Sequence, residues 1–383
     1  MKKLSFLLFF IISSFAVFGQ KQGVLDKEKL FDLYQNQKYN EAAVYLTSVY
    51  GEDISDFKVI NQIGYCFLMG GNTAKAEKFY QKANTLQPSN ISVLFNLASI
   101  ASRRGNTEKS KTYYQDIIEL DTANFNAYKQ LALLQTEDFS LKKLQYLRKA
   151  NKLNPLDADV VFDLSELYLR TGMFGIVENI LQPALEADSN NIQLLKIKLP
   201  LMLATKKLDE AITTGERLFS LGDSSAYVLN NLGKVYYMKK EFQTGLDYFK
   251  KVRLSASDDN EGLFYNMALC NRGLKDYLTA AENFKKAISA GISKNTLTYY
   301  TKMGESYEQA EKFELAAATY KKGSFFDNNS GLLYILAQIY DKKLNQKTNA
   351  ITTYAQVLRS LPDTEGNKPA KEYITKRIEE LKK

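Results

Sequence analysis

Residues 60–90 read INQIGYCFLMGGNTAKAEKFYQKANTLQPSN and contain two helical stripes separated by a turn signal. Ile60, Ile63 and Phe67 recur at steps of three and four, the spacing that places side chains on one face of a helix. A second stripe of the same spacing begins at Ala76, and the Gly-Gly-Asn between the stripes favours a helix end. This stretch therefore predicts two short antiparallel helices whose apolar faces meet.

The same unit recurs along almost the whole chain. A mostly small residue near its middle returns every 33 to 36 residues, at Ala42, Ala76, Ser110, Lys143, Val177, Ala211, Gly245, Ala280, Ala316 and Ala350. A second column precedes it by 11 to 13 residues, at Gly64, Ala98, Ala132, Ser165, Leu199, Gly233, Ala268, Gly304 and Ala337. One helix pair cannot bury its apolar side alone, so the repetition predicts a stack in which each pair covers the next.

These columns resemble the tetratricopeptide repeat (TPR). The match is close at residues 60–90, including a proline after the second helix, and nearly as close at 229–252 and 299–323. The resemblance extends over residues 24–364 and implies an all-α fold, a right-handed α-solenoid of about ten TPR-like helix hairpins. The family's tryptophan is missing, because the chain has no Trp.

Departures from the pattern suggest a division of the chain into parts. Two repeats are degenerate, and in the second of them, residues 192–225, Leu199 stands where a small residue is expected. Pro183 and Pro200 fall inside two successive predicted helices, where proline removes a hydrogen bond and kinks the helix. We therefore expect an N-terminal stack over residues 20–191, a possible joint at 192–225 and a C-terminal stack over 226–364.

Residues 365–383 are expected to form a capping helix on the last hairpin. Pro369 suits a first helical turn, and Tyr373, Ile374, Ile378 and Leu381 share one face of the helix. A terminal repeat needs such a cover with a polar outer side.

The first 19 residues have the features of a secretory signal peptide. Lys2 and Lys3 precede an apolar run from Leu4 to Phe18, and Gly19 is small enough to precede a cleavage site. We therefore expect an exported, periplasmic or secreted bacterial protein without a transmembrane segment after cleavage. The net charge of +8 over 383 residues is weak and its lysines alternate with acids, so nucleic acid is not an expected partner.

The composition argues against catalysis. The chain has no His and only two Cys, which excludes histidine bases, histidine-containing metal sites and cysteine-only zinc sites. Cys66 and Cys270 occupy equivalent positions in two first helices and are expected to be small buried side chains. We find no phosphate loop or paired catalytic acids, and expect no enzyme activity, no metal and no cofactor.

Polar residues on the first helices indicate a groove that binds a protein or peptide of the cell envelope. Off the core stripe, the position of Gln62 is an amide in five of nine repeats, and amides offer donors and acceptors to a peptide backbone. In some TPR proteins an Asn at this position bonds along an extended peptide, so the resemblance carries this role to the Asn residues. The expected groove residues are Gln62, Tyr65, Asn96, Gln130, Asp163, Glu166, Asn231, Lys234 and Asn266.

Two alternatives stay open at this point. The amides are equally explained as solvated side chains or as hydrogen-bond donors to a neighbouring helix, since one such bond contributes only about 1 kcal/mol and requires no ligand. The 25 Tyr and 22 Phe residues also allow a protein that binds glycans or cell wall by ring stacking. Oligomeric state and the identity of the partner do not follow from the sequence.

Overall fold

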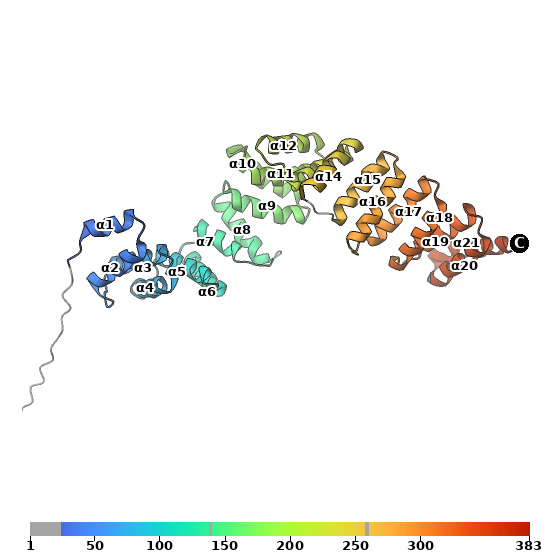
Figure 1. Cartoon of the computed structure of the whole chain (residues 1–383). Coiled ribbons are helices and arrows are strands. Elements are labelled where there is room, and N and C mark those ends of the chain that lie inside the picture. Colours follow the sequence, from blue (N-terminus) through green and yellow to red (C-terminus); the bar gives the residue numbers. More distant parts are fainter. Residues whose placement is uncertain (1–23, 138–139, 257–259) are drawn as a thin grey trace, which may run out of the picture. The chain divides into compact units, whose positions relative to one another are not determined.

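The computed structural model describes residues 24–137, 140–256 and 260–383, which form 21 α-helices, two short 3₁₀ turns and no strand (Figure 1). The predicted signal peptide, residues 1–19, lies outside the described residues. The chain divides into two compact units, residues 1–155 (unit 1) and 156–383 (unit 2). Each unit is a stack of antiparallel helix pairs, so the predicted all-α solenoid of helix hairpins is confirmed.

Unit 1 contains four pairs, formed by α1 (Lys27–Gln35), α2 (Tyr39–Tyr50), α3 (Phe57–Met69), α4 (Thr73–Leu86), α5 (Ile91–Arg103), α6 (Thr107–Leu120), α7 (Phe125–Leu133) and α8 (Leu141–Leu153). Unit 2 continues with α9 (Ala158–Arg170), α10 (Phe174–Ala187), α11 (Ile192–Ala204), α12 (Leu208–Ser220), α13 (Ala226–Met238), α14 (Phe242–Ala256), α15 (Glu261–Gly273), α16 (Tyr277–Ala290), α17 (Thr296–Gln309), α18 (Phe313–Gly323), η1 (Ser324–Phe326), α19 (Gly331–Lys342), α20 (Lys347–Ser360), η2 (Glu365–Asn367) and α21 (Lys368–Lys382).

Most first helices start at an Asp or Asn whose side chain caps the free backbone N–H groups of the first turn. Asp56, Asn90 and Asn124 accept hydrogen bonds from backbone N–H groups two or three residues later, and Asp157, Asn191 and Asn260 repeat the arrangement. Such a cap stabilises a helix by about 1 kcal/mol. These caps were not predicted from the sequence, although their spacing follows the repeat.

Small residues on the first helix admit a large ring from the second. At Gly233, an added Cβ atom would lie 2.6 Å from the ring of Phe249, and Gly304 faces Tyr320 in the same way. At Gly245 on α14, an added Cβ would lie only 3.0 Å from the carbonyl oxygen of Gly233. In the pair α13/α14 the two helices are therefore so close that Gly is required at the contact.

The degenerate repeat 192–225 reverses this arrangement. Leu199, fully buried, takes the place of the first-helix glycine, and Gly215 stands on α12 where the other repeats have a large side chain. An added Cβ at Gly215 would meet Leu232 of the next pair at 2.6 Å. The close approach thus lies between successive pairs instead of within one pair.

The two internal prolines lie in unit 2 and do not interrupt their helices. Pro183 lies inside α10 and Pro200 inside α11, and both helices continue past them. The boundary between the compact units falls earlier, after Pro155. A joint at residues 192–225 stays a prediction.

The predicted capping helix is α21, which packs against α20. Ile374 and Leu381 are buried in its contact with the last pair. Arg377 donates through Nε and Nη2 to the carboxylate oxygens of Asp341 on α19, at 2.8 and 2.7 Å, and this pairing lowers the pKa of the buried Asp341 carboxyl. The polar cap is therefore attached by an ion pair as well as by apolar contacts.

Both cysteines are buried on first helices, as predicted. Burial raises the pKa of Cys66 above its usual range and the pKa of Cys270 to about 12. A buried thiol with a raised pKa is unreactive, so both act as small core side chains.

Candidate binding surfaces

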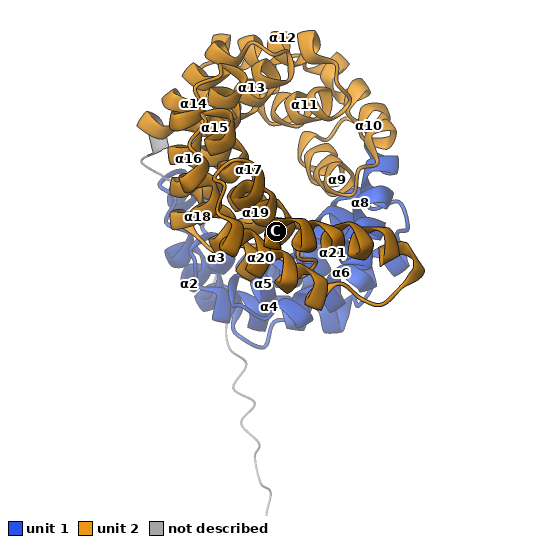
Figure 2. Ribbon diagram, turned by 90° about the vertical axis from the view of Figure 1, so that its right-hand side faces the viewer, with its two compact units in different colours: residues 1–155 blue, residues 156–383 orange. Residues whose placement is uncertain are grey.

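The first helices of unit 2 follow one another along the inside of its curve, and the second helices lie outside them (Figure 2). We call the side of unit 2 formed by α9, α11, α13, α15, α17 and α19 its inner face. The predicted groove residues of unit 2 lie on these first helices, and those of unit 1 lie on α3, α5 and α7.

In unit 1, the predicted residues engage neighbouring aromatic side chains to different degrees. Gln62 donates from Nε2 to the hydroxyl oxygen of Tyr34 at 2.8 Å, a bond to the preceding pair. Tyr65 is 46% exposed and meets the ring of Tyr39 edge-on, with centroids 6.3 Å apart. The other two, Asn96 and Gln130, are half-buried on α5 and α7.

On α9 and α13 of unit 2, burial separates residues that the sequence treats alike. Asp163 is half-buried and Glu166 is exposed, both on α9. Asn231 is only 7% exposed, and its Nδ2 donates to the backbone carbonyl of Tyr227 at 2.9 Å. One of the two N–H groups of the Asn231 amide is therefore already bonded within its own helix.

A pocket of about 290 Å³ lies between α13 and α15 and brings together two predicted residues, Lys234 and Asn266. Tyr227 and Asn230 of α13 line it as well, over a floor that includes Leu263. Asn230 was missed by the sequence analysis; the Asn-Asn doublet at 230–231 was the available signal. The pocket thus brings together one ammonium group and three asparagine amides, of which Asn260 already caps α15.

Lys234 carries the charge of this pocket. It is half-buried, and burial lowers the pKa of its ammonium group. Within the described residues, neither Lys234 nor the side chains of Asn230 and Asn266 form a hydrogen bond or ion pair. A partly desolvated cation without a counter-charge attracts an anionic ligand group more strongly than an exposed lysine does.

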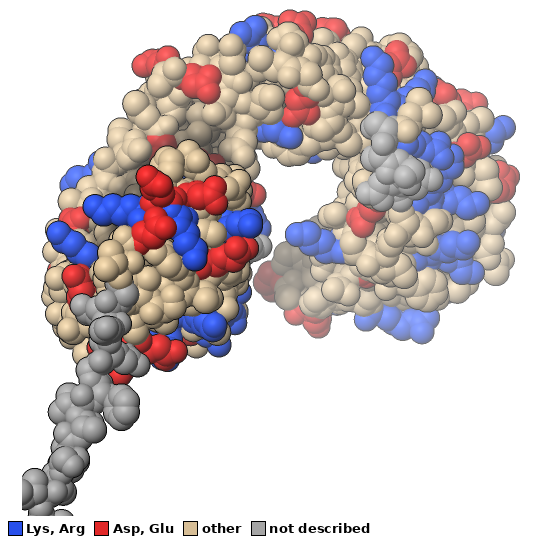
Figure 3. Space-filling view, turned by 60° about the vertical axis from the view of Figure 1, so that its left-hand side comes forward, with Lys and Arg blue, Asp and Glu red and all other residues tan. Residues whose placement is uncertain are grey.

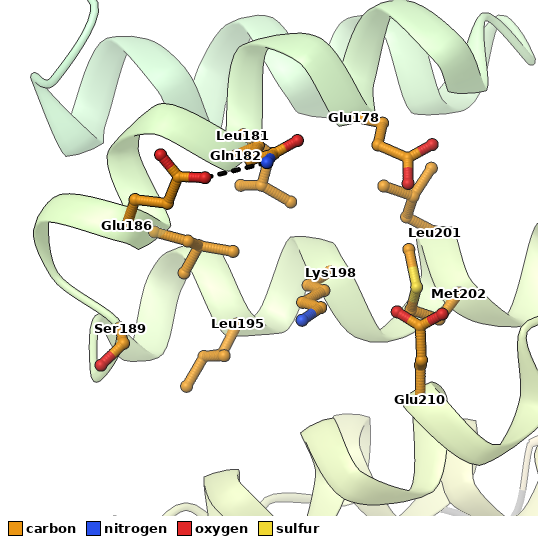
Figure 4. Close-up of a pocket in the computed structure, with 11 residues that line it drawn as sticks. Glu178, Leu181, Gln182, Glu186, Ser189, Leu195, Lys198, Leu201, Met202 and Glu210 are labelled. Carbon is orange, nitrogen blue, oxygen red and sulfur yellow. Dashed lines mark hydrogen bonds between the residues drawn. The ribbon is translucent and has the colours of Figure 1, made fainter.

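A second pocket of about 410 Å³ lies over α11, between α10 and α12 (Figure 4). Leu181, Leu195 and Met202 provide its apolar lining, and Lys198 of α11 lies between the flanking helices. Glu178, Gln182, Glu186 and Glu210 stand around it in the same view. Of these acids, Glu178 binds Lys207 at 2.5 Å and Glu186 accepts from Gln182 at 2.8 Å.

This second pocket was not predicted from the sequence. Its signal was α11 itself, in which the segment IQLLKIKLPLMLA is apolar on nearly every side. A helix with apolar residues all round is expected to be covered on all sides. Here the side toward α10 and α12 remains partly open.

On the face shown in Figure 3, acidic and basic side chains are interspersed. In the described part of the chain, no helix has the length and hydropathy needed to cross a membrane. The same residues contain no group of three or more acids or cysteines placed to hold a metal ion.

Comparison with known proteins identifies the repeat. Family models described as tetratricopeptide repeat match residues 57–90, 91–124 and 332–364. Two of these matches lie in unit 1 and one lies in unit 2. Proteins built from such repeats generally use extended surfaces to bind other proteins.

Individual relatives are distant. A bovine protein, the BBSome complex member BBS4, is 21% identical over 223 residues, which are 56% of this chain and 41% of that protein. The chain thus spans about two fifths of the length of that relative. A crystal structure of a tetratricopeptide repeat protein from Parabacteroides merdae is 19% identical, covers 66% of this chain and 98% of its own, and has a TM-score of 0.43.

Structural similarity to another solved structure extends over nearly the whole chain. A monomeric mutant of IFIT1 with Gppp-AAAA is 15% identical, covers 92% of this chain and 89% of its own, and has a TM-score of 0.51. At this identity the likeness supports the helical-repeat fold alone.

Proposed function

We propose that this chain is a non-enzymatic interaction scaffold of the bacterial envelope that binds a segment of a partner protein on its inner face. The repeats support a protein-binding role, and the features of residues 1–19 support export. The observation that carries the proposal is the pocket between α13 and α15, where Lys234 lies half-buried without a counter-charge.

The pocket defines the chemistry of the segment. A carboxylate, from a side chain or a chain terminus, would supply the charge that Lys234 lacks, and Asn230 and Asn266 would bond backbone amides beside it. Because the pocket is already formed, little ordering of the scaffold opposes binding. Many modest contacts along the first helices would then hold an extended segment.

The test is a substitution that separates binding from folding. Lys234→Met keeps an unbranched side chain of nearly the same length but removes the charge, so we expect much weaker capture of the partner by crosslinked affinity purification from intact cells. The same change should raise the stability of the chain by about 0.5–1 kcal/mol, because an unpaired, partly buried charge is removed. Lys312→Met, at an exposed lysine before α18, is the matched control.

Unchanged capture by Lys234→Met, with the control also unchanged, would refute the inner-face pocket as the anchor.

A glycan-binding role is the second candidate, supported by one feature of unit 1. Tyr34, Tyr39 and Tyr65 form a ring cluster in which Tyr65 is exposed and able to stack on a sugar. Binding on a glycan array that is lost in Tyr65→Ala and retained in Lys234→Met would favour that role.

A further inference from the structure

Three consecutive second helices carry a lysine pair at the same repeat position. The pair follows a buried aromatic in α14, α16 and α18, as Phe249-Lys-Lys, Phe284-Lys-Lys and Tyr320-Lys-Lys. All six lysines are exposed. The pairs occupy the same position in each repeat, and the three helices that carry them lie outside the first helices of unit 2 (Figure 2).

Exposed apolar side chains stand at the ends of the same helices. Ile292, just after α16, is 77% exposed and Phe325, just after α18, is 84% exposed. Leu254 near the end of α14 is 86% exposed. Among the described large hydrophobic residues, only two others, Val24 and Leu141, are more than three quarters exposed. Leu254 and Phe325 follow the lysine pairs of α14 and α18 by three and four residues, the spacing of one helix face, and large apolar side chains exposed beside lysines indicate a contact surface.

The turns that carry Ile292 and Phe325 are held by specific contacts. Beside Ile292, the Ser293 hydroxyl donates to Glu261 Oε1 at 2.5 Å, and the Tyr299 hydroxyl donates to the same oxygen at 2.5 Å. Beside Phe325, Phe326 stacks on Tyr300 with centroids 5.7 Å apart. The two apolar side chains are thus presented by fixed turns.

The lysines of α16 and α18 are not neutralised by acids. Lys285, Lys286, Lys321 and Lys322 have no carboxylate within salt-bridge distance among the described residues, although Lys286 lies over the ring of Phe264. On α14, Lys250 does pair with Asp247, at 3.6 Å. Asp258 and Asp259 follow α14 in the sequence and lie outside the described residues. We therefore define the basic edge from α16 and α18 alone, as Lys285, Lys286, Ile292, Lys321, Lys322 and Phe325.

We propose that the basic edge binds an anionic phospholipid surface. The four lysines contact headgroup phosphates, and Ile292 and Phe325 enter the boundary between headgroups and acyl chains. Each lysine near an anionic membrane strengthens binding roughly fivefold, and buried apolar area adds to it. Nucleic acid also attracts lysines, but its phosphate backbone offers nothing to an exposed Ile or Phe.

The test measures co-sedimentation of the purified chain with vesicles of phosphatidylcholine, alone and mixed with phosphatidylglycerol. We expect binding only to the mixed vesicles, weakened by added salt. Lys321→Gln with Lys322→Gln should reduce it by roughly 25-fold. Arg148→Gln with Lys149→Gln is the matched control, because this pair occupies the same repeat position on α8 of unit 1 and should leave binding unchanged. Every variant keeps the same N-terminal segment, so the differences report on the basic edge.

A second variant tests the apolar contribution. Ile292→Ser with Phe325→Ser should weaken vesicle binding at least tenfold. The binding that remains should still fall with added salt, because it depends on the lysines. Equal binding to both vesicle types, or an equal loss in the control pair, would overturn the proposal. The proposal would also be overturned if the chain bound no vesicles but bound RNA or an acidic peptide, and if the serine variant bound that ligand equally well. Lys234→Met should retain vesicle binding, which keeps this result separate from that of the inner-face pocket.

Discussion

The pairs α13/α14 and α11/α12 are neighbours in unit 2 and fill the same repeat positions with opposite side chains. In α13/α14, Gly233 admits the ring of Phe249. In α11/α12, the buried Leu199 takes the first position and Gly215 the second, and Gly215 faces Leu232 of the next pair. Each of these two repeats therefore has one close contact between helices. In α13/α14 it lies within the pair, and in α11/α12 it lies at the junction with the next pair.

The two pockets also lie on different sides of these pairs. Beside the closely packed pair α13/α14, a pocket lies between α13 and α15, and Lys234 and Asn266 line it. Around α11, the open space instead lies toward the second helices, over Leu195 and Lys198. A change in the position of the close contact thus accompanies a change in the side that is accessible. The following predictions test this relation.

The largest effect is expected at Leu199. Leu199→Ala leaves a cavity in a fully buried site and should lower the free energy of unfolding by about 3 kcal/mol. Urea denaturation followed by circular dichroism measures it, with Leu278→Ala, at a 47% exposed position of α16, as the control. A loss no larger than that of the control would mean that Leu199 does not replace the close contact.

A smaller but diagnostic effect separates the two glycines. Gly233→Ala forces a Cβ against the ring of the buried Phe249 and should cost about 2 kcal/mol. Gly215→Ala would place its Cβ within 2.9 Å of Cγ and both Cδ atoms of the buried Leu232, whose branched end adjusts more easily than a ring, and the change gains helix propensity, so its cost should be smaller than that of Gly233→Ala. Thermal unfolding of the two variants under the same conditions compares them. Equal losses would show that the two junctions are equally rigid.

The smallest effect is expected at Gly175 in α10. An added Cβ there has no heavy atom within 4 Å, so Gly175→Ala brings only the gain in helix propensity. We expect a stabilisation of about 0.5–1 kcal/mol in the same thermal assay. A destabilised variant would indicate that α10 needs a flexible residue at its start, next to the pocket over α11.

Much of the fold was predictable because the repeat imposes it many times. Small, apolar and aromatic columns identified the helix pairs, the buried Cys66 and Cys270, and the capping helix with Ile374 and Leu381. The ion pair between Arg377 and Asp341 was not predicted, because the two residues lie in different helices outside the regular columns. Contacts that occur once leave no periodic signal.

The candidate sites were predictable only in part. The polar side of the first helices contained Lys234 and Asn266, which the pocket between α13 and α15 brings together. The pocket over α11 was not predicted. The sequence of an apolar helix predicts burial on all sides, whether or not a neighbouring helix covers each side. The lysine pairs of α16 and α18 read as ordinary solvated faces until the exposure of Ile292 and Phe325 was known.

The amino-acid sequence by itself determined the helix pairs, their order and the face that each helix buries, since these follow from spacing within one repeat. The tertiary structure decided which polar groups remain available. Asn231 and Asn266 are both asparagines at the same repeat position. Asn231 is buried and bonded to the backbone carbonyl of Tyr227, whereas Asn266 lines a pocket. The physical reason is that burial and hydrogen bonding depend on how neighbouring helices pack, which the period of a single chain does not contain.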